Sequence, residues 1–295
     1  MMLLTEQKIL ELQKKANDIR RSIIKMLLEA KSGHTAGPLG MADIFTLFYF
    51  HILKHNPKDP FWEERDRVVL SNGHICPVLY AAMAHAGYFP VEELKTLRKF
   101  GTRLQGHPHR EYMPWLDTSS GPLGSGLSQA VGMALADKIP ARNASGIADA
   151  GGDKKEQQRF IYCFMSDGEL NEGNIWEAMM LAGKHKLGNV IAVIDRNNIQ
   201  IEGDTEEVMP LEPLKSKWLS FNWHVIETTG HDFRALNEAV EEAQAIYEKP
   251  TVIIAHTIPG KGVSFMEKNY KWHGKPPNKE EAEKALDELK IGAGR

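Results

Sequence analysis

The chain contains very few cysteines and no long uninterrupted run of hydrophobic residues. Only Cys76 and Cys163 occur among 295 residues, and both stand in apolar stretches. Two thiols cannot form the disulfide framework of a small secreted protein, so buried free thiols in a reducing compartment are the favoured interpretation. No apolar run approaches the ~20 residues that span a bilayer, and the N-terminus becomes charged too early for a secretory signal. We therefore expect a cytoplasmic protein with no membrane partner.

A strong charge of either sign is also missing. The chain has 36 Lys and Arg residues against 39 Asp and Glu residues, a formal net charge of −3. This balance gives no reason to expect nucleic acid as a partner. The hydrophobic fraction of 42% and charged fraction of 25% are those of an ordinary soluble globular protein, and the length suffices for a sizeable core.

Short apolar runs alternate with helical patterns along the chain. Buried strands are predicted where the runs are apolar on both faces, over 67–71, 160–165, 189–195 and 251–256. Helical periodicity predicts helices over 6–30, 127–139, 175–186, 233–248 and 278–290, with Thr5 and Asp232 as N-caps. The alternation predicts one α/β domain over 1–295, a doubly wound, mainly parallel sheet with helices on both faces. Residues 141–158 are polar and Gly-rich, which predicts a flexible surface loop within it.

Two polar residues follow two consecutive predicted strands. Asp167 lies two residues after the end of the run 160–165, and Asn197 lies two residues after the end of 189–195. In an open parallel sheet, ligands bind outside the carboxyl ends of the strands. A carboxylate and a carboxamide oxygen there suit Mg²⁺ or Ca²⁺ when phosphate oxygens complete the coordination. Each pair, Asp-Gly and Asn-Asn, is also an ordinary turn at a strand end, and that alternative stays open for either pair alone.

Taken together, the two pairs and the strand-helix-strand between them resemble the thiamine diphosphate motif, which begins Gly-Asp-Gly and ends some thirty residues later in Asn. Ser166 replaces the first glycine of that motif. The resemblance implies thiamine diphosphate and Mg²⁺ as cofactors, with Ca²⁺ or Mn²⁺ as substitutes for the metal. Asp167, Asn197 and the main-chain carbonyl of Ile199 would hold the metal, and Gly168 and Glu169 would lie against the diphosphate.

The rest of the chain narrows this resemblance to the transketolase family. Five stretches look like transketolase motifs in transketolase order: "SGHTAGPLGMADI" (32–44), "DRVVLSNGH" (66–74), "LQGHP" (104–108), "GPLGSG" (121–126) and "WHGKPP" (272–277). Each is weak alone, because a Gly-flanked histidine is usually a loop residue. Five in order around a metal-diphosphate motif make coincidence implausible.

The resemblance assigns roles to further residues. The imidazoles of His34, His107 and His273 would contact the hydroxyl groups and carbonyl of a donor sugar and stabilise the alkoxide that forms. Imidazole suits this role because it can donate or accept hydrogen bonds and titrates near neutrality. His74 would lie near the diphosphate, and Glu172 at an interface between subunits near the cofactor. Contacts with the two rings of the cofactor would come from Gly121, Leu123 and Ile201. The remaining histidines are interpreted as surface or core residues: His51, His55, His85, His109, His185, His224, His231 and His256.

The length of the chain points to a partner. A complete transketolase is more than twice as long and adds a pyrimidine-binding domain and a C-terminal domain, which we expect to be absent from residues 1–295. The resemblance therefore implies the N-terminal, diphosphate-binding subunit of a split transketolase. Its partner would be a C-terminal subunit that supplies the activating glutamate, in an assembly of two copies of each chain. Together they would transfer a two-carbon ketol unit from a ketose (phosphate) to an aldose (phosphate).

Two alternatives remain open from the sequence. One is a subunit of another thiamine diphosphate enzyme, similar to deoxyxylulose-phosphate synthase or to a 2-oxo-acid dehydrogenase, although the latter leaves the histidines unexplained. The other is a regulatory module that binds the cofactor without catalysis. The intact set of metal-binding residues and histidines favours the enzyme, because a module without catalysis has no chemical reason to retain them.

Overall fold

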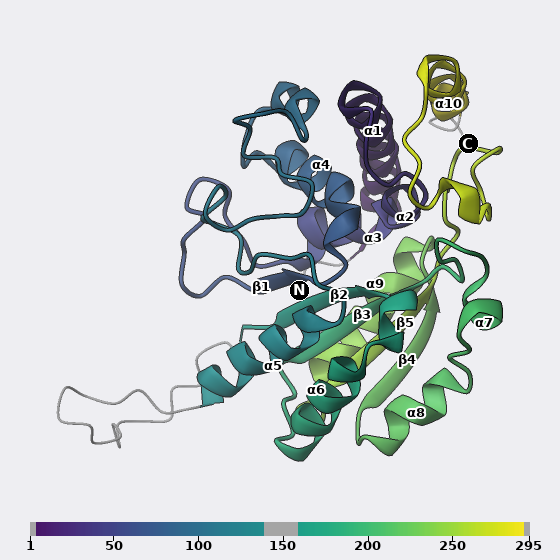
Figure 1. Ribbon diagram of the computed structural model, residues 1–295. Coiled ribbons are helices and arrows are strands. Elements are labelled where there is room, and N and C mark those ends of the chain that lie inside the picture. Colours follow the sequence, from purple (N-terminus) through teal and green to yellow (C-terminus); the bar gives the residue numbers. More distant parts are fainter. Residues whose placement is uncertain (1–3, 139–158, 292–295) are drawn as a thin grey trace.

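One parallel β-sheet lies at the centre of the molecule (Figure 1). The structure is a computed structural model that describes residues 4–138 and 159–291, so the loop predicted over 141–158 lies outside the described residues. The five strands are β1 (Arg67–Leu70), β2 (Ile161–Ser166), β3 (Val190–Arg196), β4 (His224–Thr229) and β5 (Thr251–His256). Their spatial order is β1-β2-β3-β5-β4, and every neighbouring pair is parallel.

Four of these strands lie where the apolar runs predict them, whereas β4 was missed. The side chains of β4 are half-buried or exposed along most of its length. The strand lies at the edge of the sheet and pairs only with β5. An edge strand needs no continuous apolar run, so polar residues such as Glu227 and Thr228 hid it from a search for buried strands.

Helices cover both faces of the sheet, which confirms the predicted doubly wound α/β fold. Buried side chains of α1 (Glu6–Ala30), α2 (Ala36–Gly40), α3 (Ala42–Leu47), α4 (Cys76–Ala86) and α9 (Phe233–Ala245) form one core with Tyr162 and Phe164 of β2. Those of α5 (Ser125–Lys138), α6 (Gly173–Lys184) and α8 (Leu214–Ser220) form the other, with Ile161, Cys163 and Met165. Alternate residues of β2 thus face opposite cores, as the period of a strand requires. In Figure 1, α1 to α4 lie on one side of the sheet, and α5, α6 and α8 on the other.

The two predicted N-caps are confirmed. The Thr5 hydroxyl oxygen accepts a hydrogen bond from the Lys8 N–H at 3.2 Å, and Asp232 Oδ1 accepts from the Arg234 N–H at 2.8 Å. There are two further α-helices: α7 (Thr205–Val208) follows β3, and α10 (Lys279–Ile291) ends the described chain. Among the described residues, no helix is both long and apolar enough to cross a membrane.

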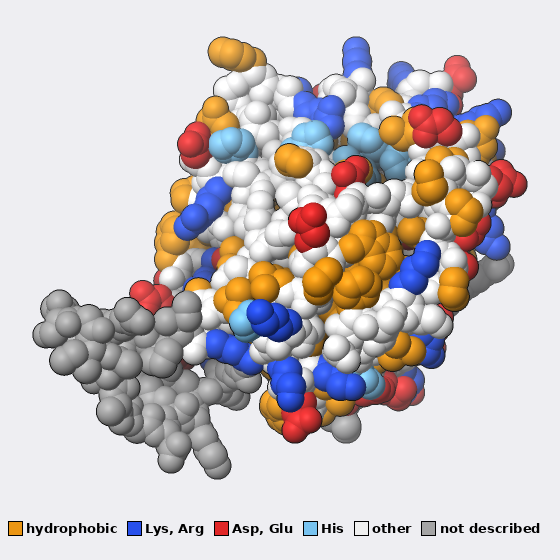
Figure 2. Space-filling view, turned by 60° about the horizontal axis from the view of Figure 1, so that its bottom comes forward, with side chains coloured by type: hydrophobic (Ala, Val, Ile, Leu, Met, Phe, Trp, Pro, Cys, Tyr) orange, Lys and Arg blue, Asp and Glu red, His pale blue; other side chains and the backbone are white. Residues whose placement is uncertain are grey.

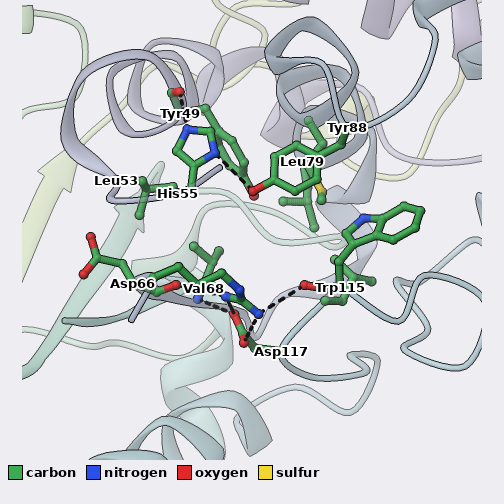
Figure 3. Close-up of a pocket in the computed structure, with 12 residues that line it drawn as sticks. Tyr49, Leu53, His55, Asp66, Val68, Leu79, Tyr88, Trp115 and Asp117 are labelled. Carbon is green, nitrogen blue, oxygen red and sulfur yellow. Dashed lines mark hydrogen bonds and ion pairs between the residues drawn. The ribbon is translucent and has the colours of Figure 1, made fainter. Parts of the chain in front are cut away.

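A buried polar cluster beside α4 is structural (Figure 3). Both terminal guanidinium nitrogens of Arg65 donate to the Asp117 carboxylate, at 2.9 and 2.7 Å. The ring of His55 bonds to the Tyr88 hydroxyl at 3.1 Å and to the Tyr49 carbonyl at 2.9 Å. The cavity between these side chains measures about 30 Å³, room for about one water molecule. It is too small for a cofactor, and His55 serves packing, as predicted.

Candidate functional site

The carboxyl ends of β2 and β3 bring the two halves of the predicted metal motif into contact. Ser166 and Asp195 are paired in the parallel register. One residue on, the Asp167 N–H donates to the Asp195 carbonyl at 3.1 Å. Asp167 Oδ2 accepts from the N–H of Asn198 at 2.8 Å, and Asn198 has the left-handed φ of 63° that asparagine tolerates. The Asp-Gly and Asn-Asn turns therefore form one corner of the sheet.

The oxygens at this corner retain lone pairs that could bind a hard cation. Asp167 is fully buried, and its Oδ1 accepts the Gly168 N–H at 2.8 Å. Asn197 Oδ1 accepts the Ile199 N–H at 3.0 Å, which leaves its second lone pair free. A carboxylate offers about four acceptor sites and a carboxamide oxygen two. The donor set of Asp167, Asn197 and the Ile199 carbonyl therefore fits Mg²⁺ with phosphate oxygens.

Arg196 is a member of this corner that the sequence analysis missed. Its Nη1 donates to Asp167 Oδ2 at 3.0 Å, and its Nη2 donates to Glu206 at 2.6 Å and to Glu212 at 3.0 Å. Burial raises the pKa of Asp167, while the Asn198 N–H and the Arg196 guanidinium oppose that rise. Arg196 therefore balances the buried carboxylate and ties it to the segment around α7. The only sequence signal was a basic residue at the end of an apolar strand.

Ser166, which replaces the first glycine of the motif, causes no backbone strain. It is the last residue of β2 and is buried. Its φ is not among the positive values that the described residues adopt. Glycine is required only where the chain enters the left-handed region or where no side chain fits. The substitution therefore fits the strand.

Three predicted histidines meet at one place, each from a different segment. The ring centroids of His34 and His74 are 4.7 Å apart, and the His273 ring lies 5.4 Å from each of them. His107 lies close by, because a Cβ added at Gly121 would come within 4.0 Å of its ring. Segments that begin at residue 32 and end at residue 274 thus converge on one site.

These four imidazoles are neutral near pH 7. Burial, helped by the neighbouring His273, Arg98 and His107, lowers the pKa of His34 to about 4. Burial also lowers the pKa of His74, His107 and His273 from the ordinary value. A neutral ring offers one donor and one acceptor. Within the described residues the buried His34 Nδ1 has no hydrogen-bond partner.

A glycine-rich segment, residues 120–126, packs closely between the end of β1 and the start of α6. A Cβ at Gly124 would approach Asn174 Oδ1 to 2.1 Å, and one at Gly73 would meet Ser120 at 2.9 Å. The described part of the chain provides no hydrogen-bond partner for several buried polar atoms here: the amide group of Asn72, the Ser120 hydroxyl oxygen and Asn174 Oδ1. Buried polar groups are normally hydrogen-bonded. Their convergence on this segment fits a polar ligand such as a diphosphate, and the sequence analysis did not single them out.

Glu169 and the start of α6 complete the polar side of the site. Glu169 is 1% exposed, and its Oε2 accepts the Gly124 N–H at 3.3 Å. Burial raises the pKa of Glu169 to about 8, so its carboxyl is largely protonated at neutral pH and can donate to an anion. Glu172, at the N-cap of α6, is exposed and makes no capping bond. The first N–H groups of α6 have no side-chain cap, which suits a phosphate.

Predicted apolar contacts lie exposed near this site. Leu123 is 37% exposed and Ile201 is 66% exposed. Figure 2 shows histidine and hydrophobic side chains on the same face of the molecule. Exposed apolar side chains at a polar site are suited to cover by a ligand or another chain.

Most of the other histidines make structural contacts. His231 Nδ1 contacts the Asp43 carboxylate at 2.7 Å, and its Nε2 accepts the Ile258 N–H at 2.7 Å. Ion pairs or hydrogen bonds at the surface or within the fold likewise involve His85, His224 and His256. His109 Nδ1 accepts a backbone N–H of its own turn. None of these rings stacks on the three that converge.

Comparison with known proteins agrees with this geometry. The family model described as transketolase, thiamine diphosphate binding domain, matches residues 12–292. The chain is 41% identical over 289 residues to a 6-deoxy-6-sulfo-D-fructose transketolase subunit of Clostridium sp., covering 97% of this chain and 98% of that protein. It is 38% identical over 280 residues to an apulose-4-phosphate transketolase subunit of Phocaeicola vulgatus, covering 95% and 93%.

Solved structures show the same fold. The transketolase from Leishmania mexicana superimposes with a TM-score of 0.85 at 34% identity, over 96% of this chain and 42% of that one. The chain therefore spans less than half the length of that transketolase. The chain belongs to the transketolase family, in which it corresponds to the thiamine diphosphate binding domain.

Proposed function

We propose that the chain is the diphosphate-binding subunit of a two-subunit transketolase, which transfers a two-carbon ketol group from a ketose to an aldose. The observation that carries this proposal is the convergence of the His34, His74 and His273 rings in a chain whose Asp167 and Asn198 meet at the ends of two neighbouring strands. The two relatives that match nearly end to end are both named as transketolase subunits. Neither the fold nor the metal motif alone would require the histidines.

Cofactor binding would use the oxygens and glycines at the strand ends. Asp167, Asn197 and the Ile199 carbonyl would hold Mg²⁺, which Ca²⁺ or Mn²⁺ could replace. Thiamine diphosphate, when bound, supplies the nucleophilic carbon and the electron sink of the reaction. The residues predicted to contact it are Gly168, Glu169 and His74 at the diphosphate, and Gly121, Leu123 and Ile201 at its rings.

The histidines would orient the sugar and move protons. His34 is neutral at pH 7, so its ring would offer one donor and one acceptor to a hydroxyl group of the substrate. His273 and His107 would hold the carbonyl oxygen where negative charge develops. Rings fixed by burial need little reorganisation when the charge forms, which is the basis of this kind of stabilisation.

The partner would cover the exposed apolar side chains and complete the site. Glu172, exposed at the start of α6, would lie at that interface. A symmetric assembly of two copies of each chain would close both sites. The names of the relatives concern one sulfonated and one phosphorylated sugar. We therefore expect an anionic ketose as a donor or product, with its anion recognised by the partner.

Reconstitution tests the proposal. The chain, a candidate C-terminal transketolase subunit from the same organism, and their mixture are assayed with thiamine diphosphate, Mg²⁺ and a panel of phosphorylated and sulfonated ketoses with aldose acceptors. We expect multiple turnover from the mixture alone. Robust turnover by this chain alone would contradict the two-subunit enzyme. Tight cofactor binding without turnover in the mixture would instead identify a binding module.

A further inference from the structure

Arg98 lies where the segments that carry His34 and His107 meet. Its Nη1 donates to the hydroxyl of Ser32 at 2.8 Å, and its Nη2 donates to the carbonyl of Gly106 at 3.4 Å. Ser32 precedes His34 by two residues, and Gly106 directly precedes His107. One guanidinium group therefore bridges two segments that lie far apart in the sequence.

The local backbone directs Arg98 toward this bridge. Arg98 has a φ of 61°, in the left-handed region that few side chains adopt. Its N–H donates to the Leu104 carbonyl at 2.9 Å. A Cβ added at Gly106 would lie 3.0 Å from the Arg98 Cζ, so the glycine allows the guanidinium to lie against the backbone. Arg98 thus combines an uncommon backbone conformation with a close contact to a glycine. An arginine that only interacted with solvent would need neither feature.

We propose that Arg98 is a positioning residue that holds the His34 and His107 segments in one geometry for the sugar. This inference rests on the proposed function of these histidines. Arginine suits the task because its planar fork can bond to two acceptors at once, whereas lysine is a point charge on a flexible stem. A shift of about 1 Å in a substrate-orienting group can cost about 100-fold in rate.

The charge of Arg98 has a second, separable effect on the two rings. Burial is the main reason that the pKa values of His34 and His107 are lowered, and the Arg98 charge adds to it in both. The other titratable groups that face His34 are the rings of His273, His107 and His74. No carboxylate is among them within the described residues, and the one acidic group acting on this cluster there, Glu202, acts on His273. Arg98 is thus a cation that helps to keep both rings neutral.

Turnover by the reconstituted two-subunit enzyme provides the first test. Arg98→Gln removes the charge and the fork, and Arg98→Lys keeps only the charge. The matched control is Lys99→Gln, because Lys99 is the next residue and pairs with Glu29 on the surface at 3.5 Å. We expect Arg98→Gln to lower kcat about 10- to 100-fold, with KM changed less than about threefold, and Arg98→Lys to recover only part. A kcat for Arg98→Gln equal to that of Lys99→Gln would overturn the proposal.

Titration of the histidine rings in the full chain, monitored by NMR, provides a readout independent of turnover. We expect Arg98→Gln to raise the pKa of both His34 and His107, and Arg98→Lys to raise neither by as much. His224, which contacts Glu242 instead, serves as the internal control. An unchanged pKa at either ring would contradict the second effect, the action of the Arg98 charge on both rings.

The third test uses the close contact at Gly106. Gly106→Ala should push the guanidinium aside and lower kcat, and it should do so far less in an Arg98→Ala background, because the two changes disrupt the same contact. Independent, multiplicative effects would refute the bridge. If the wild-type complex shows no ketol transfer, the proposed function fails, while the NMR titration still decides whether Arg98 acts on both histidines.

Discussion

At the scale of single residues, Asp167 shows how hydrogen-bond donors stabilise a buried charge. Its carboxylate accepts from Gly168, Asn198 and Arg196, although no part of the side chain is exposed. Burying an ionised carboxylate without such partners is costly. The three donors therefore stabilise the buried carboxylate, and its remaining acceptor capacity could serve a ligand.

Replacing Asp167 with asparagine should abolish Mg²⁺-dependent binding of thiamine diphosphate. The amide keeps the shape but loses the charge that binds the cation, so we expect at least about a 100-fold loss of affinity in the reconstituted complex by calorimetry. Asp204→Asn is the control, because Asp204 is exposed and makes no capping bond. Unchanged affinity in Asp167→Asn would return this residue to an ordinary turn.

The lowered pKa of His34 predicts a pH dependence of stability. Its pKa falls from 6.5 to about 4 on folding, so the unfolded chain binds more protons between these values. The free energy of unfolding must then decrease as the pH falls from about 6.5 to about 4, by no more than about 3 kcal/mol from this group. His34→Asn removes the titrating group and should make the decrease smaller. Urea denaturation at several pH values measures it, and identical slopes for both proteins would contradict the shift.

At the scale of elements, α6 runs from the site to the opposite end of the sheet, where β4 begins. It begins directly after Glu172 and carries Asn174 into the site. Near its other end, Gly183 faces the backbone that leads into β4, and an added Cβ would lie 2.1 Å from the Phe221 carbonyl oxygen. Close packing at Gly183 therefore fixes the position of the helix whose start lines the site.

Alanine at Gly183 should destabilise the protein by about 1–3 kcal/mol, because the methyl group collides with backbone that cannot turn away. Gly132 in α5 is the matched control, since it is exposed and has nothing within 4 Å of an added Cβ. Gly132→Ala should stabilise by about 0.5–1 kcal/mol through helix propensity. Urea denaturation compares the two. Equal effects of the two substitutions on the free energy of unfolding would show that the close contact at Gly183 does not contribute to stability.

For the whole molecule, exposed apolar side chains indicate where a second chain would associate. On α6, Met180 is 59% exposed and Leu181 is 41% exposed, on the helix that starts at the site. Tyr247 is 72% exposed, but it lies beside Gly188, at the amino ends of the strands. We therefore choose the residues that would bind a second chain by their position relative to the site and not by exposure alone.

Aspartate at Met180 should weaken binding of the C-terminal partner by about tenfold or more, because a charge would be buried at the interface. Tyr247→Asp, which places the same charge on an exposed apolar residue at the other end of the sheet, should have no such effect. Sedimentation of the two purified chains, mixed, measures both variants. An equal loss in the two would show that α6 does not face the partner.

Elements that depend on a local pattern could be predicted from the residues alone. Runs such as 160–165 and 189–195 are apolar on both faces, and only a covered parallel strand needs that. Asp167 and Asn197 were found because each follows such a run, and the strand ends do meet. The strand β4 was missed because an edge strand needs no such run.

Which polar groups act together depends on the folded arrangement of distant segments. The contact of Arg196 with Asp167 and the bridge that Arg98 makes between Ser32 and Gly106 join segments far apart in the sequence. The burial of Asn72 without a hydrogen-bond partner, among the described residues, likewise depends on what packs around it. Their residue types are common in surface loops, so no local pattern distinguishes them. Burial and distance do, because the energy of a charge or a hydrogen bond depends on what surrounds it once the chain has folded.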